Sequence, residues 1–125
     1  QRQMCIRDRS ESAYLCLKLA WIYRGEIQEA KANGAAQERI SMYERYEKEY
    51  LEDAYRGFKQ ARETEYPPIA GMDENTITYL LTSIGIHCGK IDEARRYGSA
   101  LLISRTASMK LKNKTRDVLE TIKKN

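Results

Sequence analysis

Apolar residues recur at three- and four-residue steps along most of the chain, which is the spacing that lines one face of an α-helix. The first such run begins at Ser12 and ends at Asn33-Gly34, where a left-handed residue would close a helix. The second run stops at Pro67 and Pro68, which lack amide donors and force the preceding residue out of helical geometry. We therefore expect the first half of the chain to form one long antiparallel hairpin with its tip at Asn33-Gly34.

Three shorter helices are predicted after the prolines. Asp73 is a suitable N-cap for the first of them, and Met72 and Ile77 have the spacing of a hydrophobic staple around it. Gly89 breaks the apolar pattern and separates the first of these helices from the second. We expect these helices at 73–88, at 91–105 and from about 111 to near the end of the chain.

The long second helix also has a charged face, with an acid four residues before a base in Glu44/Lys48 and again in Glu52/Arg56. Such pairs stabilise a solvated helix by about 0.2–0.5 kcal/mol each. We interpret this face as solvated rather than as a binding patch.

The segment "GKIDEA", Gly89 to Ala94, resembles the central turn of a tetratricopeptide repeat, a helix–turn–helix unit of about 34 residues. Counted from that turn, Gly85 and Gly98 stand where two aromatic residues usually meet. Two glycines facing each other would let the two helices approach unusually closely. We interpret the segment as a degenerate repeat.

The hairpin resembles the same repeat in two separated pieces, "LAWIY" and "AYRGFKQA". Tyr23 and Ala54 are about 22 residues further apart than the repeat expects, or about three extra turns on each arm, so the hairpin should project about 16 Å beyond the repeat body. The resemblance implies an all-α, tetratricopeptide-like right-handed helical repeat of two antiparallel helix pairs, the first elongated, plus a C-terminal capping helix.

The composition fits one globular helical domain, with 42% hydrophobic and 32% charged residues and only 2 prolines and 7 glycines in 125 residues. We interpret residues 11–125 as that domain. Residues 1–10, "QRQMCIRDRS", have neither helical nor alternating apolar order, and we interpret them as a non-native or disordered start.

The net charge of +4 is concentrated at the C-terminal end, so the body of the chain is close to neutral. The cysteines Cys5, Cys16 and Cys88 form no CxxC pair, and no apolar run is long enough to cross a bilayer. We therefore expect reduced thiols, a cytoplasmic location and no membrane partner.

Residues 12–124 resemble, more specifically, the C-terminal half of an uncharacterised bacterial family that carries a domain-of-unknown-function label. The resemblance rests on "AYLCLKLAWIYRG", "MDENTITYLL" and "SRTASMKLKNKTRDVLETIKK". It implies that an N-terminal segment with a CxxC pair, similar to a zinc ribbon, belongs to the family, and no such segment is present in this sequence. It implies a helical fold and a partner-binding habit, and it establishes no activity for the family.

No residue pattern predicts catalysis, a cofactor or a metal. His87 and Cys88 are neighbours, and neighbours on a helix point about 100° apart, so they do not readily share a metal ion or form a base–nucleophile couple. The sequence lacks a phosphate-binding glycine loop, HExxH and a nucleophile elbow. We expect a protein that is not an enzyme.

Repeat scaffolds bind with the inner faces of the first helix of each pair. We therefore expect a protein or peptide partner, or the chain's own missing N-terminal segment, in a groove whose predicted lining is Tyr14, Leu17, Trp21, Tyr79, Ser83 and His87. A purely structural role for Trp21 and Tyr79 in the core is the alternative. Self-association as a homodimer through the projecting hairpin is another. Weak nucleic-acid binding is a further alternative, less favoured than a solvated helix that caps the repeat stack, and it would use a basic patch of Lys110, Lys112, Lys114 and Arg116.

Overall fold

The computed structural model describes residues 6–64 and 71–123, which form five α-helices and no β-strand. The prediction of an all-α fold is therefore confirmed for this part of the chain. The segment 65–70, which contains both prolines, lies outside the described residues. The helices are α1 (Ile6–Ala32), α2 (Gln37–Thr64), α3 (Glu74–His87), α4 (Ile91–Leu102) and α5 (Met109–Lys123).

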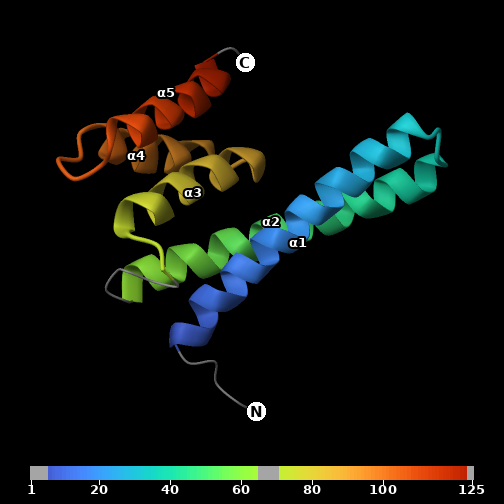
Figure 1. Cartoon of the computed structure of the whole chain (residues 1–125), viewed down its shortest axis with the longest axis horizontal. Coiled ribbons are helices and arrows are strands. Elements are labelled where there is room, and N and C mark those ends of the chain that lie inside the picture. The colour runs from blue at the N-terminus through green and yellow to red at the C-terminus, as the bar shows by residue number, and fades with distance from the viewer. Residues whose placement is uncertain (1–5, 65–70, 124–125) are drawn as a thin grey trace.

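Helices α1 and α2 form the predicted long hairpin, whose tip lies away from α3, α4 and α5 (Figure 1). Gly34 has a φ of 69° at the tip, and the amide of Ala35 donates to the carbonyl of Ala30 at 2.9 Å, so the last turn of α1 closes as the sequence predicted. Helix α1 begins at Ile6 rather than at Ser12. The stretch between these two residues contains no proline or glycine that would stop a helix.

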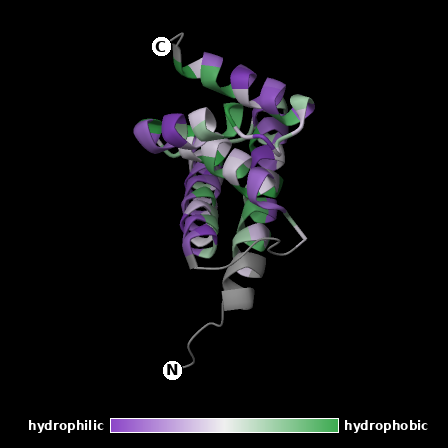
Figure 2. Ribbon diagram, turned by 90° about the vertical axis from the view of Figure 1, so that its left-hand side faces the viewer, coloured by the Kyte–Doolittle hydropathy of each residue, from purple (hydrophilic) through white to green (hydrophobic). Residues whose placement is uncertain are grey.

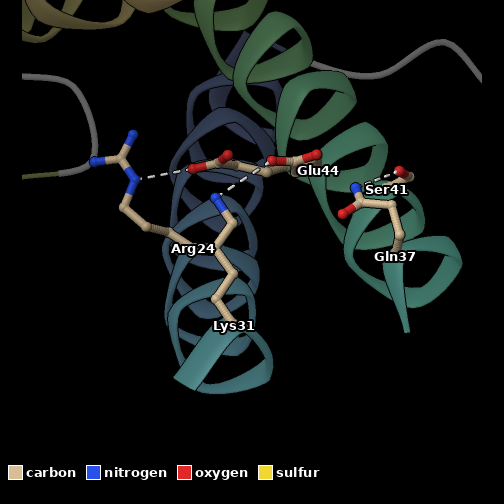
Figure 3. Close-up of polar contacts among 6 residues, drawn as sticks. Arg24, Lys31, Gln37, Ser41 and Glu44 are labelled. Carbon is tan, nitrogen blue, oxygen red and sulfur yellow. Dashed lines mark hydrogen bonds and ion pairs between the residues drawn. The ribbon is translucent and has the colours of Figure 1, made fainter. Parts of the chain in front are cut away.

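Two ion pairs join the arms of the hairpin (Figure 3). Arg24 Nε of α1 lies 2.9 Å from Glu47 Oε2 of α2, and Lys31 Nζ lies 3.7 Å from Glu44 Oε2. All four side chains keep contact with solvent, so each pair contributes at most about 1 kcal/mol. Their main effect is to favour one register of the two arms.

The predicted ion pairs along α2 are wrong. Glu44 reaches across to α1 instead of pairing with Lys48, and Arg56 pairs with Asp53 rather than with Glu52. Residues three and four apart are both neighbours on a helix, so local spacing alone does not choose between them.

A tyrosine cluster fills the middle of the hairpin, between its tip and the end at which α2 packs against α3. The ring of Tyr23 on α1 lies 5.8 Å from that of Tyr43, 5.3 Å from that of Tyr46 and 5.8 Å from that of Tyr50. These are the centroid separations of favourable aromatic pairs. Beyond the cluster, only three buried apolar residues hold the tip together, namely Ile27, Ala30 and Ile40.

The main core forms where α2 packs against both α1 and α3. Phe58 of α2 is fully buried at its centre, with Leu17 of α1 and Leu81 of α3 in the same cluster. Small residues of α2, including Ala54 and Ala61, are also fully buried and allow the neighbouring helices to approach. Helix α2 is thus the central element of the fold.

The start of α3 agrees with the sequence. Asp73 accepts a hydrogen bond from the amide of Thr76 at 2.8 Å, which makes it the predicted N-cap. Met72 packs against the main core and Ile77 is buried within it, as a staple requires.

The end of α4 differs from the prediction. The helix stops at Leu102 rather than at Arg105, and the hydroxyl of Ser104 accepts hydrogen bonds from the amides of Thr106 and Ala107 at 3.2 Å each. A serine that bonds the backbone in this way favours a turn over a further helical turn.

The two helical glycines, Gly85 and Gly98, do not face each other, so that expectation is wrong. A Cβ on Gly85 would lie 3.2 Å from Tyr55 of α2, whereas a Cβ on Gly98 would lie 2.9 Å from Leu119 of α5. Gly85 permits close contact of α3 with α2 and, at Ala94, with α4, whereas Gly98 permits the close contact between α4 and α5.

The described helices follow a simple order of neighbours. Helix α3 packs against α2, α4 and α5, whereas α1 packs against α2 alone, and no Cα atom of α1 lies within 8 Å of one in α3. One side of α1 is therefore left without a neighbour among the described residues.

Candidate functional site

Four large apolar side chains lie exposed on α1, in two pairs seven residues apart. Tyr14 and Leu15 are 38% and 58% exposed, and Trp21 and Ile22 are 51% and 58% exposed. Seven residues correspond to about two helical turns, so the two pairs lie on the same side of the helix. We call this surface the outer face of α1; its members are Tyr14, Leu15, Lys18, Trp21 and Ile22.

The opposite side of α1 packs against α2 and carries smaller residues. Ala13, Leu17 and Ala20 are each at most 2% exposed and belong to the main core. Helix α1 is thus apolar on two sides. The difference from α2 is visible in Figure 2, where hydrophobic positions are prominent along α1 and hydrophilic positions along α2.

Lys18 is the one charged member of the outer face. Its Nζ lies 4.6 Å from the centroid of the Tyr14 ring, a cation–π contact that leaves the ammonium close to the apolar side chains. Lys18 forms no ion pair with any residue that the structure describes. The outer face therefore presents an apolar surface around a single cation that has no carboxylate partner within the described fold.

The structure divides the predicted groove. Tyr14 and Trp21 lie on the outer face of α1, but Leu17 points into the core, so its assignment to a groove is wrong. Leu17 lies four residues after Ala13 and three before Ala20, so these three residues share one side of the helix, about 100° away from the side chains next to Leu17 in the sequence.

The three predicted groove residues of α3 lie elsewhere. Tyr79 and Ser83 are half-buried, and His87 is exposed at the end of the helix. Since α1 and α3 make no direct backbone contact, the two halves of the predicted groove are not packed together.

The charges that act on His87 belong to the ion pair between α1 and α2, Arg24 and Glu47. Partial burial and then the Arg24 guanidinium lower the pKa of His87, while Glu47 acts in the opposite direction. The charged form of the imidazole is therefore disfavoured. Within the described ranges, no group of three His, Cys, Asp or Glu side chains is placed to hold a metal ion.

The predicted basic patch is split between different sides of α5. Lys110 and Lys114 border a surface pocket with Asn75 and Thr106, near the start of α3. Arg116 borders another pocket, between α4 and α5. Lys112 is half-buried. Residues two apart on a helix do not face each other, which explains why an alternating basic sequence does not make one surface.

Sequence reasoning missed a charged pocket of about 300 Å³ beside the turn between α3 and α4. At its centre the hydroxyl of Tyr55 donates to Glu93, and Lys59 Nζ lies 3.2 Å from the same carboxylate oxygen. These bonds lower the pKa of Glu93, and burial, followed by the bond to Glu93, raises the pKa of Tyr55. The full lining is Glu52, Tyr55, Arg56, Lys59, Cys88, Lys90 and Glu93.

The polar contacts of this pocket connect α2 to α4. Burial raises the pKa of the Cys88 thiol, so the thiolate that a nucleophile requires is disfavoured. Glu93 is held as a carboxylate by a tyrosine and a lysine of α2, so it ties α4 to α2. The sequence alone does not indicate this contact, because Glu93 and its partner Tyr55 are 38 residues apart along the chain.

Comparison with known families adds one finding. A family of uncharacterised proteins conserved in bacteria (DUF2225) matches residues 2–122. The chain belongs to this family. No curated protein and no solved structure matches the chain.

The family description states no activity, so membership does not identify a reacting group. Among the described helices of this family member, none is both long and apolar enough to cross a bilayer. Four of the seven large apolar side chains that are exposed among the described residues lie on the outer face of α1.

Proposed function

We propose that this protein is a non-catalytic interaction scaffold that docks an apolar helix or peptide of another protein on the outer face of α1. The observation that carries the proposal is the pair of apolar dipeptides, Tyr14-Leu15 and Trp21-Ile22, which stay 38–58% exposed on a helix with one neighbour. Contiguous exposed apolar surface of this kind is typical of interaction sites in soluble proteins.

The spacing and charge of the outer face specify the partner further. Apolar side chains seven residues apart match the repeat with which two helices pack along each other. Lys18 lies between the two dipeptides without a described ion-pair partner, so a carboxylate on the apolar side of the partner helix complements it. Trp21 and Tyr14 are of the residue types that most often dominate binding energy.

We also infer a tetratricopeptide-like order for the second half of the fold. Helix α3 packs against both α4 and α5. In a tetratricopeptide stack, the first helix of a pair likewise packs against the second helix of its own pair and against the first helix of the next pair. In this interpretation α5 covers the apolar end of the stack, and Tyr79 and Ser83 belong to the inner surface.

The test is capture of proteins from bacterial lysate on immobilised protein, followed by identification and by reconstitution with the purified partner. We expect Trp21→Ala to lose the partner while the melting temperature stays within about 2 °C, because Trp21 is half exposed. The matched control is Ile103→Ala, which truncates a side chain that is 83% exposed outside α1.

Other outcomes assign the function differently. Equal capture by the Trp21→Ala variant contradicts docking on α1. Recovery of material that nuclease removes supports the basic side chains of α5 instead. A dimer in sedimentation velocity that Trp21→Ala dissociates makes the partner a second copy of this chain.

A further inference from the structure

A second surface lies at the opposite end of the helix order, between α4 and α5. It is a pocket of about 380 Å³ lined by Arg95, Ser99, Leu102, Arg116, Leu119 and Glu120. It shares no residue and no helix with the outer face of α1, so a role for it is independent of the function proposed above.

The sequence builds the walls of this pocket from one face of each helix. Arg95, Ser99 and Leu102 follow one another at steps of four and three along α4, and therefore project from the same side. Leu119 and Glu120 lie three and four residues after Arg116, which places them together on α5.

Gly98 sets how closely the two walls meet. A Cβ at this position would lie 2.9 Å from Leu119 Cδ1, so only the absence of a side chain lets Leu119 pack directly against the backbone of α4. Leu102 and Leu119 are both half-buried and form an apolar floor that is still accessible from solvent.

Positive charge predominates around this floor. Arg95 forms no hydrogen bond or ion pair with any described residue, and Arg116 Nη1 donates to Asn113 at 2.8 Å without a carboxylate partner. Glu120 is the single acid in the lining, so the pocket has two arginines to one carboxylate. Arginine binds carboxylates through two parallel hydrogen bonds and is enriched where such groups are recognised.

We propose that this pocket binds a peptide segment that presents a leucine-sized apolar side chain next to a carboxylate. The apolar floor consists of two leucines and fits one side chain rather than a long acyl chain. Glu120 and the leucine floor disfavour a phosphodiester backbone, which binds through cations without apolar contacts. The scaffold thus has a second docking point for an acidic and apolar segment.

The test is a titration of the ¹⁵N-labelled full chain with the peptide acetyl-Leu-Glu-Leu-Glu-Leu-amide, followed by NMR. We expect saturable shifts at the amides of Ser99, Leu102 and Leu119, with a dissociation constant on the order of 1 mM. Arg95→Gln and Arg116→Gln should each weaken binding roughly three- to tenfold, because each removes one charge-assisted contact.

Three controls make the result specific. The peptide with both glutamates replaced by glutamine should bind at least roughly threefold more weakly, whereas Lys110→Gln, which removes a charge outside the pocket, should leave binding unchanged. Trp21→Ala should also leave it unchanged, which separates this proposal from docking on α1. Equal binding of the two peptides, no effect of either arginine variant, shifts confined to other helices, or tighter binding of dodecanoate than of the peptide would each overturn it.

Discussion

Replacing helical glycines by alanine tests the packing of this fold directly. Alanine stabilises a helix interior by roughly 0.5–1 kcal/mol relative to glycine, so the net effect depends on what the added methyl group meets. At Gly25, in the exposed part of α1, no atom beyond the local helix backbone lies within 4 Å of the added Cβ. We therefore expect Gly25→Ala to raise the free energy of unfolding by roughly 0.5–1 kcal/mol.

At Gly85 the same change should have the opposite sign. The added Cβ would lie 3.2 Å from Tyr55 Cε1 and 3.4 Å from the Cβ of Ala94. Tyr55 is only 4% exposed and its hydroxyl is bonded to Glu93, so the ring has little room to retreat. Overpacking of this kind costs about 1–3 kcal/mol, which exceeds the gain in helix propensity, and the net loss should be about 1 kcal/mol.

Urea unfolding followed by circular dichroism at 222 nm measures both effects. The two variants should differ by about 1.5–2 kcal/mol in the free energy of unfolding, with unchanged m-values. Gly98→Ala is the intermediate case, because the atoms it would meet first are the terminal methyl groups of Leu119, which are the far end of a flexible and only half-buried side chain. If Gly85→Ala unfolded at the same urea concentration as Gly25→Ala or higher, the close contact between α3 and α2 would be refuted.

Three further changes test individual contacts. The bond from Tyr55 lowers the pKa of Glu93, so the stability that it contributes is present above the unfolded pKa of about 4.3 and is lost as the pH falls through the lower folded value. Glu93→Gln should therefore flatten this acid limb in pH-dependent melting. Asp73→Ala should cost about 0.5–2 kcal/mol in urea unfolding, and Asp73→Asn, which keeps the capping oxygen, should cost less. Tyr23→Ala should speed amide exchange in the distal hairpin while leaving α4 protected, because Tyr23 contacts all three tyrosines of α2 in the cluster.

Elements whose signals are local in sequence were predictable. Gly34 supplies a left-handed residue at the tip of the hairpin, and Asp73 supplies its own capping oxygen to an amide three residues later. Contacts that depend on how the helices pack against one another were not predictable from the sequence. Gly85 and Gly98 stand at matching positions around the turn, yet a Cβ would first meet Tyr55 of α2 at one and Leu119 of α5 at the other, because α3 also packs on α2 and α4 also packs on α5.

The outer face of α1 was not fully predictable for the same reason, because the sequence does not show which side of the helix meets α2. Apolar residues occupy nearly the whole circumference of this helix, so periodicity alone does not say which side α2 covers. The structure places Leu17 inside and Leu15 and Ile22 outside, and the latter two were missed because they lie off the regular three- and four-residue pattern that identifies the core. The small size of Ala13 and Ala20 could have identified the side of α1 that packs against α2, because small residues allow two helices to approach more closely.

The exposure of the outer face also bounds the affinity of a partner. Burying a large apolar side chain fully contributes about 1.5–3 kcal/mol, and the four apolar side chains of this face are already about half buried, so completing their burial contributes roughly 3–6 kcal/mol. Association costs about 4 kcal/mol or more, so this face alone supports weak binding, and a tight partner must also use Lys18 or surface beyond α1. Trp21 carries more of this apolar area than any other member, and for this reason its truncation should abolish detectable capture rather than merely reduce it.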